Sequence, residues 1–469
     1  MIDLSSGKER SVVFERTIRE NLEQWKQSAF RKPLVICGAR QVGKTTLIRE
    51  FGKSFGTFFS LNLELEEHRA YFSGKLTAQE MLQKISLDLG IRRTGDTLLF
   101  LDEIQHSPEA IAFLRYFYED MNDLYVITAG SLLEVMMDLK QISFPVGRIE
   151  YLYLFPMNFR EFLKATGETE VLTLMESIPV PSWAGEKLEA LFKTYTLIGG
   201  MPEAVDRYLR TKDITQVADV YRNLFTTYAD DVAKYARTET KKNVIRFVIE
   251  ASPLETGKRI TFEKYGNSNY RSKEIAQALR ILERAMILYL RYPVTSFTVP
   301  IRPDLKRKPR LQFLDTGLLN FRAGLQSSFF GPEPLDTLYK GILAEQIVAQ
   351  ELLSVTCKEA EPPSFWVREE SQSNAEVDFI IQRRDILVPV EVKSGKTGTL
   401  RSLHSWIDRA ALVVGSHSTK KELLAVRLYS GIFSVEHIRT PQGTPFMLIN
   451  LPLFLASRTG EYIDKYLGA

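Results

Sequence analysis

The residues from Gly38 to Thr45 have the types and the spacing that hold a nucleoside triphosphate. They follow the pattern G-x-x-x-x-G-K-T, in which the glycines let backbone N–H groups come close to phosphate oxygens. Lys44 supplies a positive charge to the β- and γ-phosphates, and the Thr45 hydroxyl is a ligand for Mg²⁺. We therefore predict that this segment binds ATP together with Mg²⁺. The predicted nucleotide contacts are Gly38, Arg40, Gly43, Lys44, Thr45 and Thr46.

Two carboxylates, Asp102 and Glu103, follow a second apolar run that begins at Thr97. An apolar strand that ends in Asp-Glu is typical of the Walker-B motif. We predict that Asp102 holds Mg²⁺ through water and that Glu103 polarises the attacking water. An acidic pair can also cap the helix expected near Ser107, but capping does not account for the apolar run before it. The sequence thus favours hydrolysis of the bound nucleotide over binding alone.

A second set of residues with chemical potential lies near the C-terminus. Glu391 and Lys393 stand two apart in an alternating run, so on a strand their side chains share one face. Asp378 follows the acidic start of the preceding strand, and Glu345 lies on the amphipathic helix expected over 339–353. An Asp, a Glu-x-Lys on the next strand and a helical Glu together resemble the PD-(D/E)XK nuclease core.

That resemblance implies a metal-dependent phosphodiesterase. Asp378, Glu391 and Glu345 would bind Mg²⁺, and Lys393 would activate water or steady the pentacovalent phosphate. Two alternatives stay open. Lys393 can simply form an ion pair with Glu391 or Asp378 across the strand pair, and such a core can be kept for binding after catalysis is lost.

Strands alternating with helices must position the phosphate-binding residues. The apolar runs 33–37, 97–103 and 124–130 are expected to be buried strands, each followed by a helix or a turn. This order predicts a doubly wound parallel α/β sheet of the P-loop NTPase class. Its ligand should lie at the carboxyl ends of the strands.

The order of motifs resembles a known family. G-A-R-Q-V-G-K-T-T-L, L-D-E-I-Q, A-G-S-L and V-G-R-I-E in the first third are similar to AAA-type ATPases of the AAA_14 kind that carry a C-terminal DUF4143 domain. In the second half, the run from Leu311 to Leu319, the run from Gly341 to Glu345, and E-V-D with P-V-E-V-K-S-G support the same family. The resemblance spans nearly the whole chain and implies ATP binding.

Three further residues are candidates for catalysis under this resemblance. In an AAA-type sheet, the strand beside Walker B ends in a polar residue that touches the γ-phosphate or the lytic water, which points to Thr128 or Ser131. Arg148 follows on from this strand and is a candidate finger or sensor for transition-state charge, in cis or in trans. An ordinary strand-to-turn residue and a solvated arginine are the corresponding structural alternatives.

We divide the chain into four parts. These are an AAA-type ATPase domain at 1–155, a helical lid at 156–250, a winged-helix-like region at 251–325 and a DUF4143-like, restriction-endonuclease-like α/β domain at 326–469. In the lid, 198–202 is expected to be a turn. In the winged-helix-like region we expect a first helix over 260–265, a second over 272–284 with Ser272 as N-cap, and wing strands within 286–292 and 309–314.

Arg271, Lys273 and Arg280 of the second helix, together with the basic loop 302–310 that joins the wing strands, could contact DNA phosphates. Glu274 and Glu283 on the same helix oppose that interpretation, because they would repel the DNA backbone. A module that packs against the lid with solvated charges is the alternative. The sequence leaves both open.

Bulk composition narrows the possible partners and location of the protein only slightly. A net charge of +3 and a pI of about 8.5 do not by themselves indicate a nucleic-acid partner. The two cysteines have no spacing typical of a metal site or a disulfide framework, and no apolar stretch is long enough to span a bilayer. We therefore expect a cytoplasmic protein without a membrane partner. Its oligomeric state stays open.

The leading functional prediction is an Mg²⁺-dependent ATPase coupled to nucleic-acid handling, with DNA favoured over RNA, through a nuclease-like domain. The alternative is a nucleotide-gated switch of the signalling NTPase type. In that case the nuclease-like domain is inactive and holds a protein partner.

Overall fold

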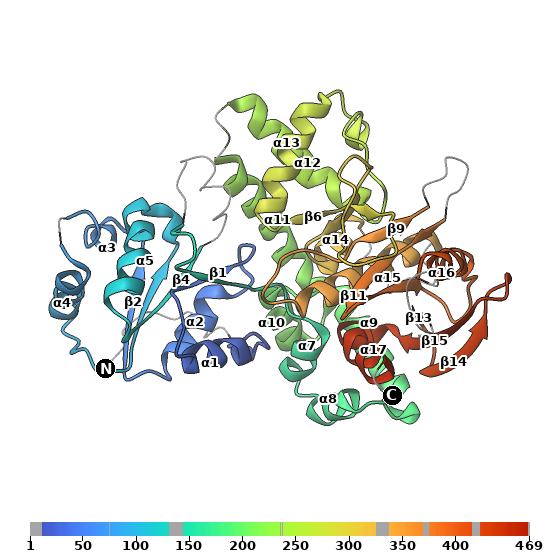
Figure 1. Ribbon diagram of the computed structural model, residues 1–469. Helices are drawn as coiled ribbons and strands as arrows, with labels where there is room; N and C mark the ends of the chain where they lie inside the picture. The colour runs from blue at the N-terminus through green and yellow to red at the C-terminus, as the bar shows by residue number, and fades with distance from the viewer. Residues whose placement is uncertain are drawn as a thin grey trace.

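The computed structural model describes residues 12–74, 76–130, 144–234, 236, 238–324, 337–368, 375–414 and 423–467. In Figure 1 the N-terminal domain lies at one end of the molecule, and the C-terminal domain, coloured orange to red, lies at the other. Helices of the middle region lie between them. Across the described ranges, no helix combines the length and the apolar character needed to cross a membrane.

The N-terminal domain is built on five parallel strands in the order β2-β3-β4-β1-β5. The strands are β1 Leu34–Cys37, β2 Thr57–Asn62, β3 Thr97–Asp102, β4 Leu124–Ala129 and β5 Glu150–Tyr153. The helices are α1 Arg19–Gln27, α2 Lys44–Gly52, α3 Glu66–Arg69, α4 Ala78–Asp88 and α5 Pro108–Asp120. Every residue of β1 and β3 is buried, as expected when helices cover both faces of a parallel sheet. The predicted parallel α/β domain is confirmed.

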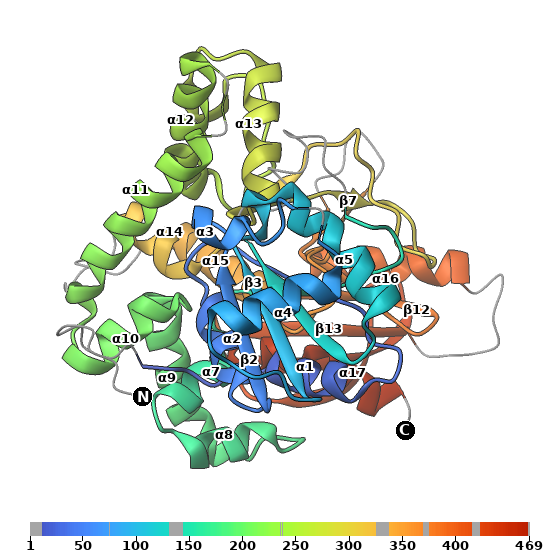
Figure 2. The same cartoon turned by 90° about the vertical axis from the view of Figure 1, so that its left-hand side faces the viewer.

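The middle region is helical. Its helices are α7 Phe159–Ala165, α8 Thr169–Glu176, α9 Gly185–Ile198, α10 Pro202–Thr211, α11 Ala218–Lys234, α12 Glu239–Glu255 and α13 Ser272–Arg284. The turn expected at 198–202 joins α9 to α10. In both views α12 and α13 lie side by side and project from the rest of the molecule (Figures 1 and 2).

The winged-helix-like region departs from the prediction in its first helix. Residues 260–264 are not helical, and Tyr265–Asn267 forms only a short 3-10 turn, η4. Gly266 and Asn267 both have positive φ there, which interrupts a helix. The predicted helix over 272–284 matches α13, but Arg271 rather than Ser272 occupies the N-cap position. The predicted wing strands are present as the antiparallel pair β6 Leu288–Arg291 and β8 Arg310–Phe313.

The C-terminal domain contains a mixed sheet in the order β11-β12-β13-β15-β14. Its strands are β11 Phe379–Arg383, β12 Ile386–Lys393, β13 Leu423–Tyr429, β14 Ser434–Arg439 and β15 Pro445–Pro452. A small sheet of β7 Pro293–Val294, β9 Phe365–Val367 and β10 Glu376–Val377 lies beside it. The helices are α15 Thr337–Ser354, α16 Arg401–Val414 and α17 Thr459–Leu467, with the 3-10 segment η6 Leu453–Arg458 before α17. β11 and β12 pair antiparallel, as predicted for the hairpin that carries Asp378 and Glu391.

A buried carboxylate joins the second half of the chain to the lid. Asp315 caps α14 (Thr316–Arg322) by accepting from the N–H groups of Gly317 and Leu318 at 2.9 and 3.2 Å. Its other oxygen accepts from the N–H of Gly200 at 2.6 Å. An added Cβ at Gly199 would lie 2.2 Å from an Asp315 oxygen, so only glycine fits there. Asp315 therefore holds the turn between α9 and α10.

Candidate functional site

The loop between β1 and α2 has the backbone that the phosphate-binding pattern predicts. Gly43, the N-cap of α2, has a φ of 98°, a conformation that L side chains rarely adopt. Gly38 is required for a different reason, because an added Cβ would lie 2.5 Å from the carbonyl oxygen of Leu154. The loop thus leads from the carboxyl end of β1 into the N-terminus of α2, whose unpaired N–H groups favour an anion.

Lys44 is buried at the centre of this loop. Its ammonium group donates to the carbonyl oxygens of Gly38 and Ala39, both at 2.8 Å. Burial lowers the pKa of Lys44 to about 8, although the nearby carboxylates of Glu103 and Asp102 oppose the shift. The positive charge is therefore held by neutral carbonyl groups, which a phosphate can replace as partners.

The predicted metal ligands, Thr45 and Asp102, meet across the end of the sheet. The Thr45 hydroxyl donates to Asp102 Oδ2 at 2.8 Å, and the N–H of Glu103 donates to Asp102 Oδ1 at 3.1 Å. Burial raises the pKa of Asp102. A hydroxyl and a carboxylate are the oxygen donors that Mg²⁺ prefers in proteins, so the pair fits the ion that the motif implies.

Glu103 lies beside this pair with its backbone in the left-handed conformation, at a φ of 51°. Its carboxylate accepts a hydrogen bond from the side-chain amide of Gln105, a contact that sequence reasoning missed. Strained backbone of this kind is often found where a side chain is directed into a functional site. Glu103 lines the same cleft as Lys44 and Thr45, where the predicted water-activating role requires it.

The cleft over the loop has a volume of about 480 Å³. Besides the predicted loop residues, its walls include Phe14, Arg16 and Pro202, for which sequence reasoning assigned no role. Arg16 is buried, donates to the carbonyl oxygen of Val42 at 2.8 Å and forms an ion pair with Glu161 at 2.9 Å. Pro202 follows the Gly-Gly turn that Asp315 holds. The sequence indicates the approach of this turn to the cleft only by a turn pattern, in which a proline stands two residues after a pair of glycines.

Arg40, a predicted nucleotide contact, lines the cleft but has a partner in the lid. Its guanidinium group forms an ion pair with Asp231 of α11, and its carbonyl oxygen accepts from the Tyr228 hydroxyl at 3.0 Å. Thr46 lines the cleft and is exposed. The loop is therefore tied to α11, which leads toward α12 and the winged-helix-like region.

Two other catalytic residues, Ser131 and Thr128, are predicted at the end of the strand beside Walker B. Ser131 lies outside the described residues. Thr128 is fully buried in β4, opposite Leu101 in β3, and its hydroxyl has no hydrogen-bond partner within the described part of the chain. A contact from either residue to a γ-phosphate stays a prediction.

Arg148, the candidate finger or sensor in cis or in trans, lies away from the phosphate-binding loop of its own chain. Glu150 pairs with Leu34 at the start of β1, whereas Tyr153 pairs with Cys37 next to the phosphate-binding loop. Arg148 therefore lies at the amino edge of the sheet, separated from the loop by at least the length of β1, roughly 10 Å. There it forms an ion pair with Glu119 at 2.6 Å. A role in trans stays a prediction.

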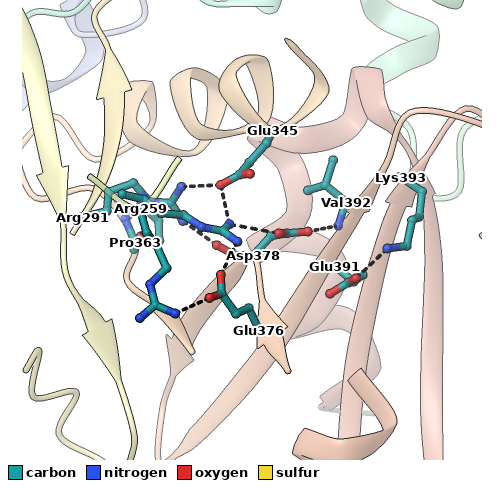
Figure 3. Close-up of polar contacts among 10 residues, drawn as sticks. Arg259, Arg291, Glu345, Pro363, Glu376, Asp378, Glu391, Val392 and Lys393 are labelled. Carbon is teal, nitrogen blue, oxygen red and sulfur yellow. Dashed lines mark hydrogen bonds and ion pairs between the residues drawn. The ribbon is translucent and has the colours of Figure 1, made fainter. Parts of the chain in front are cut away.

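The four residues predicted for the nuclease-like site lie close together (Figure 3). Asp378 Oδ2 accepts from the N–H of Val392 at 2.9 Å, which places this carboxylate beside β12. On the same strand, the Lys393 ammonium group donates to Glu391 Oε1 at 2.6 Å. Glu345 approaches from α15. The pairing of β11 with β12 therefore gathers these side chains as the alternating pattern predicted.

Two arginines from the wing strands contact two of these carboxylates, Glu345 and Asp378, and Figure 3 shows Arg291 beside Glu345. Arg310 Nη1 donates to Glu345 at 2.7 Å and to Asp378 at 3.1 Å, and its Nη2 donates to Glu376 at 2.7 Å. Arg291 Nη1 donates to the same Glu345 oxygen at 3.1 Å. We call Arg291, Arg310, Glu345, Glu376 and Asp378 the arginine–carboxylate cluster. Sequence reasoning missed Arg291, and it placed Arg310 in a basic loop that could contact DNA, whereas Arg310 is 11% exposed and is engaged by these carboxylates.

The electrostatics of this cluster differ from those of a metal site. Burial lowers the pKa of Arg310, but the carboxylates of Glu345, Asp378 and Glu376 outweigh it and raise the pKa above its usual value, so the guanidinium stays charged. Burial raises the pKa of Glu391, and the neighbouring Asp378 carboxylate adds to that shift. Within the described residues, no group of three or more Asp, Glu, His or Cys side chains is arranged to hold a metal ion. The cluster does not fit the divalent ion that the nuclease resemblance implies.

The phosphate-binding loop, the Thr45–Asp102 pair and the parallel sheet define an NTPase of the P-loop class. A family model described as an AAA domain matches residues 30–163. Models of two domains of unknown function, DUF8612 and DUF4143, match residues 189–328 and 340–427. The chain thus carries an AAA domain of the AAA_14 family followed by a C-terminal DUF4143 domain, and the predicted resemblance is confirmed.

One curated relative is the uncharacterized protein MJ1637 of Methanocaldococcus jannaschii, which is 23% identical over 311 residues. The match covers 62% of this chain and 63% of that protein, so the chain spans less than two thirds of its relative. Among solved structures, the Walker-type ATPase PABY2304 of Pyrococcus abyssi aligns with a TM-score of 0.44 at 16% identity, over 68% of this chain and 99% of that one. The ORC2 protein of Aeropyrum pernix in its ADP form aligns with a TM-score of 0.27 at 14% identity, over 67% and 92%. These TM-scores are too low to establish a common overall arrangement.

Proposed function

We propose that this protein is an Mg²⁺-dependent ATPase that acts as a nucleotide-gated switch. The observation that carries the proposal is that Lys44, Thr45 and Glu103 line one cleft at the carboxyl edge of a parallel sheet, with Asp102 hydrogen-bonded to Thr45. Few arrangements other than nucleoside triphosphate hydrolysis use a lysine, a hydroxyl–carboxylate pair and a further carboxylate in this order.

Each residue has a distinct task in this proposal. The N–H groups at the start of α2 and the Lys44 ammonium group bind the β- and γ-phosphates, and Thr45 with Asp102 would hold Mg²⁺. The bound ion neutralises phosphate charge. Glu103 orients the attacking water and accepts its proton, and the Gln105 amide restrains the Glu103 carboxylate.

The test of this proposal is the substitution Glu103→Gln. Because the amide keeps the size of the side chain but cannot accept the proton, we expect turnover to fall at least about 100-fold while ATP still binds. Glu50→Gln is the matched control, because Glu50 lies on α2 and pairs with Lys53 at 2.6 Å. Initial ATPase rates and equilibrium binding of a fluorescent ATP analogue separate the two effects. Unchanged turnover in Glu103→Gln would remove Glu103 from the mechanism.

The C-terminal domain supports the switch more than the nuclease. Asp378 and Glu345, which a nuclease needs as metal ligands, are engaged by Arg310, and Glu391 is paired with Lys393. The proposed role of this domain is to bind a partner and to respond to the nucleotide through the lid. Supercoiled and linear DNA incubated with the protein, ATP and Mg²⁺ or Mn²⁺ should stay intact. Cutting that Lys393→Ala abolishes would instead establish an active nuclease.

Coupling to DNA is the second candidate, and helix α13 favours it. Arg271, Lys273 and Arg280 are all exposed on this helix. Glu274 and Glu283 were expected to repel DNA. Their carboxylates accept hydrogen bonds from the backbone N–H groups of Arg271 at 3.0 Å and of Leu290 at 2.9 Å, respectively. The three basic side chains are thus available for phosphate contacts. Double-stranded DNA should stimulate the ATPase, and replacing all three residues with alanine should remove that stimulation. No effect of DNA on the wild-type rate would leave a protein partner as the output.

A further inference from the structure

A second cavity lies far along the chain from the nucleotide-binding residues. It has a volume of about 360 Å³ and opens between α9, the first turns of α15 and the carboxyl ends of β12, β13 and β15. Ser394, Tyr429 and Pro452 mark these three strand ends. The carboxyl edge of parallel strands and the junction of two domains are both favoured places for small ligands, and the volume lies within the usual range of such sites.

The floor of this cavity is apolar. Phe192 and Leu197 of α9 face Leu343 and Ile347 of α15, and Phe454 closes the side next to β15. All five side chains are buried or nearly so. A floor of this kind favours an apolar or aromatic body, because burying it removes apolar surface from water.

Besides Ser394, the hydroxyl-bearing residues on the walls already use their hydroxyl groups within the protein. Thr196 donates to the carbonyl oxygen of Phe192 at 2.8 Å, Ser430 to that of Ser394 at 3.0 Å, and Tyr429 to that of Ile432 at 2.7 Å. The walls therefore offer few free donors for a ligand with many polar groups. A sugar or a polar amino acid does not suit this cavity.

The rim carries the charge. Lys193 of α9 and Lys340 of α15 are both exposed at the cavity, with a single carboxylate, Glu189, beside them. Throughout the described ranges, neither ammonium group has a carboxylate within 4.0 Å. Lys340 also lies in the first turn of an 18-residue helix, whose N-terminal end favours an anion. The rim thus has an excess positive charge next to an apolar floor.

We propose that this cavity binds a small amphipathic anion, with its apolar body on the floor and its anionic head between Lys193 and Lys340. The ligand is an effector of the ATPase, and this part of the inference rests on the proposed function. Helix α9 forms one wall of the cavity and continues through Gly199 and Gly200 into α10, whose Pro202 lines the nucleotide cleft. The short turn between α9 and α10, which Asp315 contacts through Gly200, is thus the connection by which a ligand in the cavity would act on the nucleotide cleft.

The direct test uses 8-anilinonaphthalene-1-sulfonate, an aromatic monoanion, titrated into the full chain without nucleotide and followed by fluorescence and calorimetry. We expect one site per chain. Replacing both Lys193 and Lys340 with glutamate should weaken binding at least tenfold. Lys187→Glu is the matched control, because Lys187 lies on α9 outside the cavity and pairs with Glu168 at 2.9 Å. The uncharged analogue N-phenyl-1-naphthylamine should not distinguish the double variant from the wild type.

Two further measurements complete the test. Ala344→Trp fills the floor and should abolish binding in a protein whose melting temperature is unchanged; if it fails to fold, the charge variants decide alone. Binding that is equal in wild type and double variant overturns the site. When the probe saturates the wild type, the protein's affinity for a fluorescent ATP analogue should change at least threefold. The same probe concentration should leave the affinity of the double variant unchanged. An unchanged affinity overturns the effector role, and it does so whether or not the protein hydrolyses ATP, because only binding is measured.

Discussion

The nucleotide cleft and the arginine–carboxylate cluster both bring charged side chains into a buried place, but they leave those charges in opposite conditions. In the cleft, Lys44 is held by carbonyl oxygens and Asp102 by a hydroxyl group. In the cluster, Glu345 and Asp378 are held by the guanidinium of Arg310. Neutral partners leave a charge that a ligand can still compensate, whereas an internal ion pair has already compensated it.

In the sequence, both regions look like sites of catalysis. This difference in how their charges are compensated distinguishes them. The cleft is organised for an anion and a cation supplied from outside. The cluster contains its own cation, so its carboxylates fasten the wing strands to α15 and to the strand pair β11–β12. The same types of residue thus stay available to a ligand in one region and attach domains to each other in the other. The following substitutions test this contrast.

The largest effect is expected from Arg310→Met. Arg310 is 11% exposed, and the substitution removes the ion pair of the largely buried Asp378, while Glu345 keeps its pair with Arg291 and Glu376 its pair with Arg259. Removing one partner of a buried ion pair costs about 3–5 kcal/mol. Urea unfolding should therefore show a fall in the free energy of unfolding of that size. Arg259→Met is the control, because Arg259 is 36% exposed and its pair with Glu376 lies nearer the surface, so its cost should be about 0–1 kcal/mol. Equal effects of the two substitutions would contradict the contrast.

Next in size is Lys44→Ala in the nucleotide cleft. Losing two charge-assisted hydrogen bonds to phosphate should cost about 3 kcal/mol, or roughly 100-fold in ATP affinity. In contrast to the arginine substitution, the free energy of unfolding should change little, because the partners left behind are carbonyl groups. Equilibrium binding and urea unfolding measured on the same preparation give both values. A variant that binds ATP normally but unfolds easily would reverse the assigned roles of the two regions.

A smaller effect is expected from pH. The pKa of Lys44 is lowered to about 8 in the free protein, so above this pH the side chain loses the proton that phosphate binding requires. ATP affinity should stay constant from pH 7 to 8 and then fall by up to about tenfold per pH unit, since one pKa unit corresponds to about 1.4 kcal/mol. The phosphates of ATP are fully ionised in this range, and Lys44→Ala should show no such fall. A flat profile up to pH 9.5 would mean that Lys44 keeps its proton.

The smallest effect is expected from Asp231→Asn. This substitution releases the Arg40 guanidinium from its ion pair with α11, so that the arginine becomes available to phosphate. A half-exposed pair is worth about 1 kcal/mol at most, so ATP affinity should rise up to about fivefold. Stopped-flow binding of a fluorescent ATP analogue measures the change. Weaker binding in this variant would show that the Arg40–Asp231 pair shapes the loop for the nucleotide instead of competing with it.

Much of the nucleotide site could be predicted because its parts are local. The glycines, Lys44 and Thr45 belong to one continuous strand–loop–helix, and the φ of 98° at Gly43 is a property of that loop. The alternation around Glu391 likewise placed Lys393 on the same face. The position of Arg148 could not be predicted, because the edge of the sheet that a residue reaches depends on strand register, which pairs Glu150 with Leu34. Helix 260–265 failed within its own range, where Lys264 has a positive φ of 52° that is incompatible with an α-helix.

The sequence by itself determined that the protein has a phosphate-binding loop, an acidic strand end and a β-hairpin with acids on one face, since periodicity and short motifs act over a few residues. Only the tertiary structure decided what those acids do. Arg291 and Arg310 lie 54 and 35 residues from Glu345 in the chain, and no local pattern indicates that they meet. The partner of a buried charge is chosen by packing between domains, and that partner decides whether a charge is left for a ligand.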